Sequence, residues 1–221
     1  MIFRNRREAG RLLAGQLAHY ANRADVLVLA LPRGGVPVGL EVAESLRAPM
    51  DVFVVRKVGV PGCEELAMGA ISTGGVCVRN EEVIEELGIR GEVFEAGAER
   101  ERVELERRER AFRGQRPAPD VRGRTVILVD DGLATGSTMR AAARALRSQQ
   151  PARIIVGVPV GAPEACEEFR REVDEVVCAV TPEPFHGVGQ WYEDFTQTSD
   201  DEVHDILGRF RAKSLYAAGS L

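Results

Sequence analysis

The chain has 221 residues, 44% of them hydrophobic and 29% charged, which predicts one globular domain with a sizeable core. Its formal net charge of −5 argues against a nucleic-acid partner, because proteins that bind nucleic acids carry a basic surface. The sequence has no apolar run long enough to span a membrane and no apolar stretch near its N-terminus, so we expect neither a membrane span nor a signal peptide.

The four cysteines stand apart from one another in the sequence, at Cys63, Cys77, Cys166 and Cys178. None belongs to a C-x-x-C pair and none has a histidine nearby, which argues against a zinc site. Separate thiols are typical of proteins in a reducing compartment, so we expect a cytoplasmic location.

The first third of the chain alternates between helix and strand patterns. Helices are expected over 5–20 and 36–46, and buried strands over 26–31 and 50–55. The strand segments are continuous apolar runs, as in strands that are covered on both faces. A hairpin is expected over 69–78, with its turn at Thr73-Gly74-Gly75.

A charged segment at 80–116 interrupts this alternation and predicts a helical insertion. Asn80 can cap a short helix, and a long helix follows over 92–113. The long helix carries two acid–base pairs at i,i+4 spacing, Glu104–Arg108 and Glu106–Arg110. This helix can be interpreted either as a solvated surface helix or as a partner-binding helix, and the charge pattern favours the first interpretation.

The second half of the chain again alternates strands with helices. Strands are expected over 125–129, 154–158 and 175–180, and helices over 137–148 and 163–172. Together these elements predict an α/β fold with an open, mostly parallel sheet flanked by helices. Ser199 and Glu202 form a capping box that begins a last helix, and the residues 213–221 are expected to be a flexible tail.

The segment 126–138 has the features of a ribose-phosphate site. Its strand ends in Asp130 and Asp131, at the edge where open α/β sheets bind ligands. A loop of small residues then begins a helix, whose N–H groups and dipole attract an anion. The residues expected to hold the phosphate are Ala134, Thr135, Gly136, Ser137 and Thr138. Carboxylates repel phosphate but bind sugar hydroxyls, so the two aspartates are expected to hold a ribose.

This segment resembles the signature of the type I phosphoribosyltransferases, in which two acidic residues follow a hydrophobic strand and precede a small-Thr-Gly-small-Thr loop. The match is complete except at Gly132, where the family usually has a bulky apolar residue. The resemblance implies a single domain over 1–221 with a small hood at 181–199. It also implies Mg²⁺ as cofactor, which Asp130 and Asp131 contact mainly through the ligand and water.

The loop after the first strand resembles the pyrophosphate loop of the same family. Arg33, Gly34 and Gly35 are the residues expected to bind pyrophosphate there, and the resemblance implies a cis non-proline peptide around Arg33. Arg56 and Lys57 resemble a basic pair in adenine-type members, which also faces pyrophosphate. Lys57 is one of only two lysines in the chain. Composition alone does not decide whether this lysine has a chemical role or occurs by chance, and the resemblance favours a chemical role. The segment 59–79 would then be a mobile loop and hairpin.

The aromatic segment at 181–195 resembles the part of purine-type members that stacks on the base. The residues implied in acceptor binding are Phe185, Val188, Trp191 and Tyr192. Packing of the hood against the core is the alternative. The lysine that reads the base in purine-oxo enzymes is missing from the corresponding stretch at 158–162, so the base is not identified.

The resemblance therefore implies an enzyme that transfers a phosphoribosyl group from phosphoribosyl pyrophosphate to a small aromatic, nitrogenous acceptor. The residues implied in catalysis are Arg33, Lys57, Asp130 and Asp131. No nucleic acid or membrane is expected as a partner, and a homodimer is left open. The alternative is a non-catalytic regulatory protein that binds phosphoribosyl pyrophosphate or a nucleotide. A sugar-phosphate hydrolase is disfavoured, because no nucleophile–base pair is recognisable.

Overall fold

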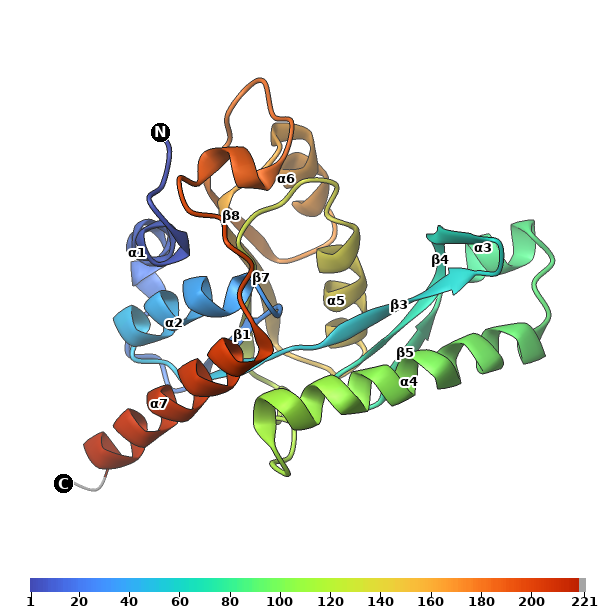
Figure 1. Ribbon diagram of the computed structural model, residues 1–221, viewed down its shortest axis with the longest axis horizontal. Helices are drawn as coiled ribbons and strands as arrows, with labels where there is room; N and C mark the ends of the chain where they lie inside the picture. The colour runs from blue at the N-terminus through green and yellow to red at the C-terminus, as the bar shows by residue number, and fades with distance from the viewer. Residues whose placement is uncertain (219–221) are drawn as a thin grey trace.

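The computed structural model describes residues 1–218, and its centre is a sheet with helices on both faces (Figure 1). The five strands of this sheet are parallel and lie in the order β2-β1-β6-β7-β8. Their bounds are β1 Val26–Ala30, β2 Met50–Val52, β6 Thr125–Val129, β7 Arg153–Val160 and β8 Glu175–Val180. The predicted open parallel sheet is therefore confirmed.

The central strands bury side chains on both faces, because successive residues of a strand point in opposite directions. Alternate residues of β1 and β6 pack against α1 (Arg6–Gln16) and α2 (Gly35–Leu46) on one face. The residues between them pack against α5 (Ser137–Arg147) and α6 (Pro163–Phe169) on the other. A short 3-10 helix, Ala18–Tyr20, follows α1. This two-sided burial explains why the strand segments are continuous apolar runs.

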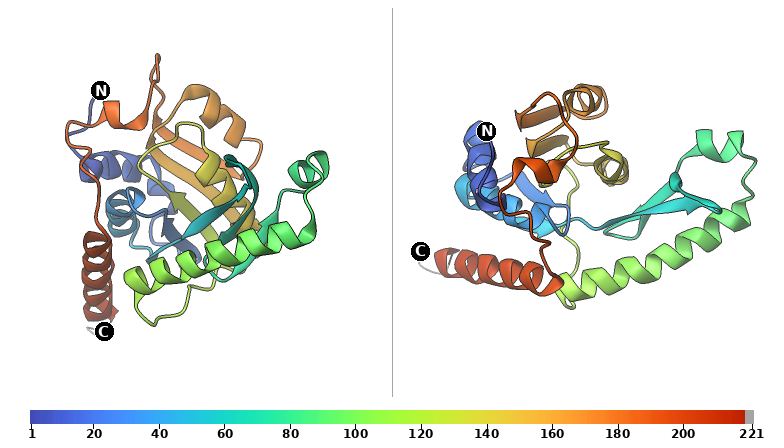
Figure 2. Two further views of the ribbon diagram at one scale, coloured as in Figure 1. Left: turned by 45° about the vertical axis from the view of Figure 1, so that its right-hand side comes forward. Right: turned by 45° about the horizontal axis from the view of Figure 1, so that its top comes forward.

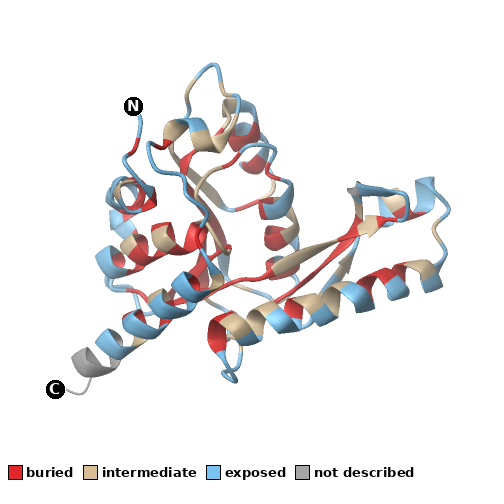
Figure 3. Ribbon diagram, in the orientation of Figure 1, coloured by how far each residue is buried: buried red, intermediate tan, exposed pale blue. Residues whose placement is uncertain are grey.

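A second sheet and two helices project from the core as an arm, which comprises residues 55–113 (Figure 2). Its elements are β3 Val55–Val60, β4 Cys63–Ser72, β5 Val76–Arg79, α3 Glu81–Glu86 and α4 Gly91–Arg113. The strands are antiparallel, and an apolar cluster of the arm's own residues fills the space between its sheet and helices. Figure 3 shows this buried layer and the exposed outer side of α4.

The arm differs from the prediction in its first half. The segment 59–79, expected to be a mobile loop and hairpin, contains no loop in its first part, because β3 and β4 continue through residues 59–70 as paired strands around a short turn at Pro61 and Gly62. Asn80 does not cap α3 with its side chain. The hairpin turn at residues 73–75, the long helix, and its Glu104–Arg108 and Glu106–Arg110 pairs at 2.8 and 3.2 Å are confirmed.

The last helix, α7 (Asp200–Ala218), begins at the predicted capping box. The Glu202 N–H donates to the Ser199 hydroxyl at 3.1 Å, and the Ser199 N–H donates to the Glu202 carboxylate at 2.8 Å. The flexible tail expected at 213–221 is wrong for residues 213–218, which are helical, and the rest of it lies outside the described residues. Within residues 1–218, no helix combines the length and apolarity needed to cross a membrane.

A disulfide joins Cys166 of α6 to Cys178 of β8, whereas Cys63 and Cys77 are free and exposed. The expectation of four separate thiols is therefore wrong for two of them. Folding brings α6 back along the end of the sheet beside β8, so two cysteines that belong to no sequence motif become neighbours.

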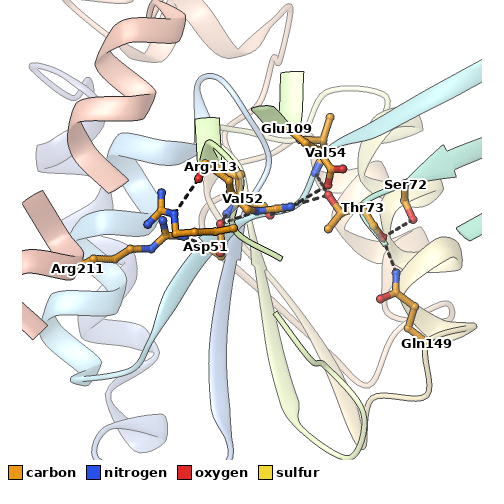
Figure 4. Close-up of polar contacts among 10 residues, drawn as sticks. Asp51, Val52, Val54, Ser72, Thr73, Glu109, Arg113, Gln149 and Arg211 are labelled. Carbon is orange, nitrogen blue, oxygen red and sulfur yellow. Dashed lines mark hydrogen bonds and ion pairs between the residues drawn. The ribbon is translucent and has the colours of Figure 1, made fainter. Parts of the chain in front are cut away.

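The arm is attached to the core by a network of polar side chains, which we call the joint (Figure 4). Asp51 of β2 accepts hydrogen bonds from Arg113 at 3.0 Å and from Arg211 of α7 at 2.7 Å. Arg113, the last residue of α4, also donates to the Val52 carbonyl at 2.7 Å and the Thr73 hydroxyl at 3.3 Å. The side chains of Asp51 and Arg113 are only 9% and 2% exposed, so water screens their attraction little.

Candidate active site

Two loops meet at the carboxyl edge of the central sheet, because β1 and β6 are adjacent parallel strands. The loop after β1 contains Gly34 and Gly35, and the loop after β6 begins with the two aspartates. A Cβ added to Gly35 would lie 2.6 Å from the Val129 carbonyl oxygen, and one added to Gly34 would lie 2.0 Å from Asp131 Oδ2. Both glycines are therefore required for the contact between the two loops.

The peptide bond between Pro32 and Arg33 is cis, as predicted for this loop. The Arg33 guanidinium contacts the carboxylate of Asp200 at 3.4 Å, and both side chains are more than a third exposed. Beside this loop lies a cavity of about 550 Å³, which we call the edge cavity. Its lining includes Arg6, Pro32, Arg33, Gly34, Arg108 and Asp131.

The acid pair lies next to the edge cavity in a poorly solvated environment. Burial, and then the charge of Asp131, raise the pKa of Asp130 well above its usual range. Burial also raises the pKa of Asp131, although the guanidinium of Arg6 opposes this shift. The Asp130 carboxylate accepts a hydrogen bond from the Asp131 N–H at 2.8 Å, which fixes its orientation.

Arg6 is a site residue that the sequence did not indicate. Its Nε donates to Asp131 Oδ2 at 2.8 Å, and its Nη1 donates to the Thr196 carbonyl at 2.7 Å. Its guanidinium also lies 4.1 Å from the centre of the Phe195 ring. The Arg6 and Asp131 side chains are 10% and 15% exposed, so the pair is largely shielded from water. Arg6 thus ties α1 to the acid pair and to the last part of the hood.

The predicted phosphate loop joins β6 to α5 in the expected geometry. Gly136 is the N-cap residue of α5, and its φ of 71° is in the left-handed region. A Cβ at that position would also lie 2.4 Å from the Phe169 ring, so glycine is required there for two reasons. Ala134, Thr135, Ser137 and Thr138 are exposed around this helix N-terminus. The loop therefore presents hydroxyl and backbone N–H donors to solvent.

Gly132 departs from the family signature for a reason that the structure shows. A Cβ added there would lie 2.5 Å from a methyl group of Val188 in the hood, and 3.1 Å from the Val160 carbonyl oxygen. The hood valine therefore fills the space beside this position, where the family usually has a bulky apolar side chain.

Arg56 and Lys57 lie on β3 of the arm, and they line cavities other than the edge cavity. Arg56 donates to the carboxylate of Glu101 on α4 at 2.7 Å. Lys57 lines a cavity of about 290 Å³ between the arm and α5, to which Ser137 also contributes. The structure therefore brings Lys57 toward the phosphate loop but does not place either residue with Arg33.

The hood residues predicted to bind the acceptor gather in one apolar cluster, which contains Phe185, Val188, Trp191 and Tyr192. Val188 and Trp191 belong to a short 3-10 helix, Val188–Trp191. Tyr192 is buried, and its hydroxyl donates to the Asp131 carbonyl at 2.5 Å. Burial raises the pKa of Tyr192, so its hydroxyl stays protonated and keeps donating this bond. The four residues thus lie together, close to the acid pair.

The first residues of the chain brace the hood through the main chain. The Phe3 N–H donates to the Trp191 carbonyl at 2.8 Å, and the Glu193 N–H donates to the Phe3 carbonyl at 2.8 Å. The ring of Phe3 packs on Tyr192 with a centroid distance of 5.5 Å. The N-terminal segment and the hood therefore behave as one packed unit above the acid pair.

Comparisons with known proteins identify the family to which the chain is similar. A family model described as a phosphoribosyl transferase domain matches residues 2–194. Two Mycobacterium tuberculosis proteins, from strains CDC 1551 and H37Rv and each named "Putative phosphoribosyl transferase", are 46% identical over 208 residues. These matches cover 94% of this chain and 47% of each relative, so the chain spans about half their length. The crystal structure of TT1426 from Thermus thermophilus is 42% identical, with a TM-score of 0.86 over 95% of this chain and 99% of that one.

Proposed function

Because the chain belongs to the phosphoribosyl transferase family, we propose that it transfers the phosphoribosyl group of phosphoribosyl pyrophosphate to a nitrogenous acceptor and releases pyrophosphate. One observation carries this proposal. The acid pair is followed directly by the phosphate loop and is contacted on its other side by the cis-peptide loop. This order of phosphate loop, acid pair and cis-peptide loop matches a sugar that carries a phosphate at one end and a pyrophosphate at the other.

Each part of the ligand then has its own partners in the chain. The exposed donors at residues 134–138 bind the 5′-phosphate at the N-terminus of α5. Asp130 and Asp131 accept hydrogen bonds from the ribose hydroxyls. Arg33 and the backbone of Gly34 and Gly35 bind the pyrophosphate, which leaves with its electron pair.

The reaction exchanges one bond at C1 of the ribose for another. The bond from C1 to the pyrophosphate oxygen breaks, the bond from C1 to the acceptor nitrogen forms, and that nitrogen loses a proton. A positive charge develops on the ribose during this exchange, and the neighbouring carboxylates stabilise it. One of the two aspartates accepts the proton, for which a pKa raised by burial is favourable.

The residues of the acid pair also fit Mg²⁺, because carboxylate oxygens are ligands that this ion prefers. Asp130 and Asp131 would hold the ion mainly through water and the ligand, since Asp131 Oδ2 is engaged by Arg6. When bound, Mg²⁺ neutralises charge on the pyrophosphate.

The acceptor is proposed to be a small aromatic ring that binds at the hood cluster of Phe185, Val188, Trp191 and Tyr192. The support is the position of this cluster next to the acid pair. Arg56 and Lys57 stay proposed pyrophosphate ligands that require a movement of the arm, because in this structure they line other cavities.

The test is to incubate the protein with phosphoribosyl pyrophosphate, Mg²⁺ and a panel of nucleobases and related rings, and to measure pyrophosphate release. Release that requires one particular ring would support the transferase and identify its acceptor. Tight binding of phosphoribosyl pyrophosphate without release for any ring would support the regulatory alternative instead. A chain that binds neither phosphoribosyl pyrophosphate nor pyrophosphate would contradict both.

A further inference from the structure

The edge cavity contains an arginine that comes from the arm. Arg108 lies on α4, and it lines this cavity together with Arg33 and Gly34 of the cis-peptide loop. Figure 1 shows that the C-terminal half of α4 runs back from the tip of the arm to the core, where it approaches the start of α7. Asp200, the partner of Arg33, is the first residue of α7. A residue of the helical insertion thus reaches the loop predicted to bind pyrophosphate.

Arg6 and Arg56 are not available to a ligand in the edge cavity, the first because of its contacts and the second because of its position. Arg6 is held by Asp131 at 2.8 Å in a largely buried pair. Arg56 lines a different cavity, where its Nε contacts Glu101 at 2.7 Å. Arg33 has only a looser contact, 3.4 Å from Asp200. A pyrophosphate carries several negative charges, so a second guanidinium beside Arg33 would strengthen its binding.

Arg108 is able to supply the second cation. Its Nε donates to Glu104 at 2.8 Å. Among the residues that the structure describes, this is the only hydrogen bond that the Arg108 side chain makes. Its two terminal nitrogens are therefore available to a ligand. Glu104 also accepts two hydrogen bonds from Arg107, at 2.7 and 3.0 Å, so its charge is shared between two arginines. A guanidinium held at Nε and open at its two ends suits bidentate binding of a phosphate group.

We propose that α4 supplies Arg108 to the pyrophosphate end of the substrate site, which makes the helical insertion a part of that site rather than a solvated surface helix. The ligand's identity rests on the proposed function, whereas the anion site itself rests on the cavity and its arginines. The arm thereby contributes Arg108 in the conformation that the structure shows, whereas Arg56 and Lys57 line other cavities in that conformation.

The test compares two neighbouring arginines of one helix. Arg107 and Arg108 contact the same glutamate, but only Arg108 lines the edge cavity. Binding of inorganic pyrophosphate, with and without Mg²⁺, is measured by titration calorimetry for the intact chain and for Arg108→Gln, Arg107→Gln and Arg33→Gln. We expect Arg108→Gln and Arg33→Gln to weaken binding roughly 10- to 100-fold, as for the loss of a hydrogen bond between charged groups. We expect Arg107→Gln to bind like the wild type.

Two results would overturn the inference. One is an unchanged pyrophosphate affinity in Arg108→Gln, and the other is an equal loss in Arg107→Gln, which would indicate a general charge effect. Arg108→Lys, which keeps the charge but loses the planar fork, is expected to recover only part of the affinity, and thermal unfolding confirms that each variant is folded.

The outcome also separates this inference from the proposed function. Pyrophosphate binding that depends on Arg108, without transfer to any acceptor, would keep the inference and reject the enzyme. Transfer with full pyrophosphate affinity in Arg108→Gln would do the reverse.

Discussion

Replacement of Arg113 by methionine is expected to destabilise the fold by about 3 kcal/mol, because it leaves Asp51 of the joint with one cationic partner instead of two. Breaking a buried ion pair by removing one partner costs about 3–5 kcal/mol. The lower end applies here, since Arg211 still contacts Asp51 at 2.7 Å. For a chain of this size, that loss corresponds to a decrease of roughly 6–12 °C in Tm.

The matched control is Arg110→Met, one turn earlier on α4. Its partner is Glu106 at 3.2 Å, and the two side chains are 76% and 51% exposed. Exposed pairs contribute about 0–1 kcal/mol, so this variant should unfold like the wild type. The double variant Arg113→Met with Asp51→Asn should regain part of the lost stability, because the buried carboxylate is then neutral.

Urea unfolding, followed by two probes, provides the assay. Circular dichroism reports on all helices, including α4, whereas the fluorescence of Trp191, the only tryptophan, reports on the hood. If the joint couples the arm to the core, Arg113→Met should move the dichroism transition to lower urea than the fluorescence transition. Equal unfolding free energies for Arg113→Met and Arg110→Met would refute the reasoning.

Three further predictions concern the site. Asp131→Asn should weaken binding of phosphoribosyl pyrophosphate and lower turnover at least about tenfold, since a charged acceptor of ribose hydrogen bonds is lost; full activity in steady-state kinetics would reject its role. Arg6→Met should lower kcat/KM by a similar factor. The control is Arg7→Met, which should keep the wild-type kcat/KM because the Arg7 side chain is 58% exposed. Equal kinetics for these two variants would show that Arg6 does not position Asp131. Gly132→Leu should lower stability by about 1–3 kcal/mol through a clash with Val188, as measured by thermal unfolding, and Val188→Ala should restore part of it.

The central sheet was predictable because its strands are buried on both faces and therefore appear as uninterrupted apolar runs. The first half of the arm was not, because β4 begins with Cys63-Glu64-Glu65 and therefore lacks an apolar run at its start. The helical conformation of residues 213–218 was also not predicted, since α7 continues past the point where its apolar pattern fades.

The site was predictable where its residues are consecutive in the sequence. The phosphate loop, the acid pair and the cis-peptide loop are local motifs, and the structure shows the expected helix start after the phosphate loop and the expected cis peptide. The sequence did not indicate that Arg6 and Arg108 lie beside the edge cavity, because each is one of many arginines and only packing brings them there. The Cys166–Cys178 disulfide was missed for the same reason.

The brace between Phe3 and the hood has a practical consequence for anyone who produces this protein. An affinity tag fused before Met1 would start two residues from the hydrogen bonds that hold Trp191 and Glu193 in place. Arg6 follows three residues later, so a tag that pulled Phe3 away from the hood would disturb the hood and the acid pair together. Kinetic measurements on this chain are therefore best made with an untagged N-terminus, and a comparison of tagged and cleaved protein would itself report on how firmly the hood must be held.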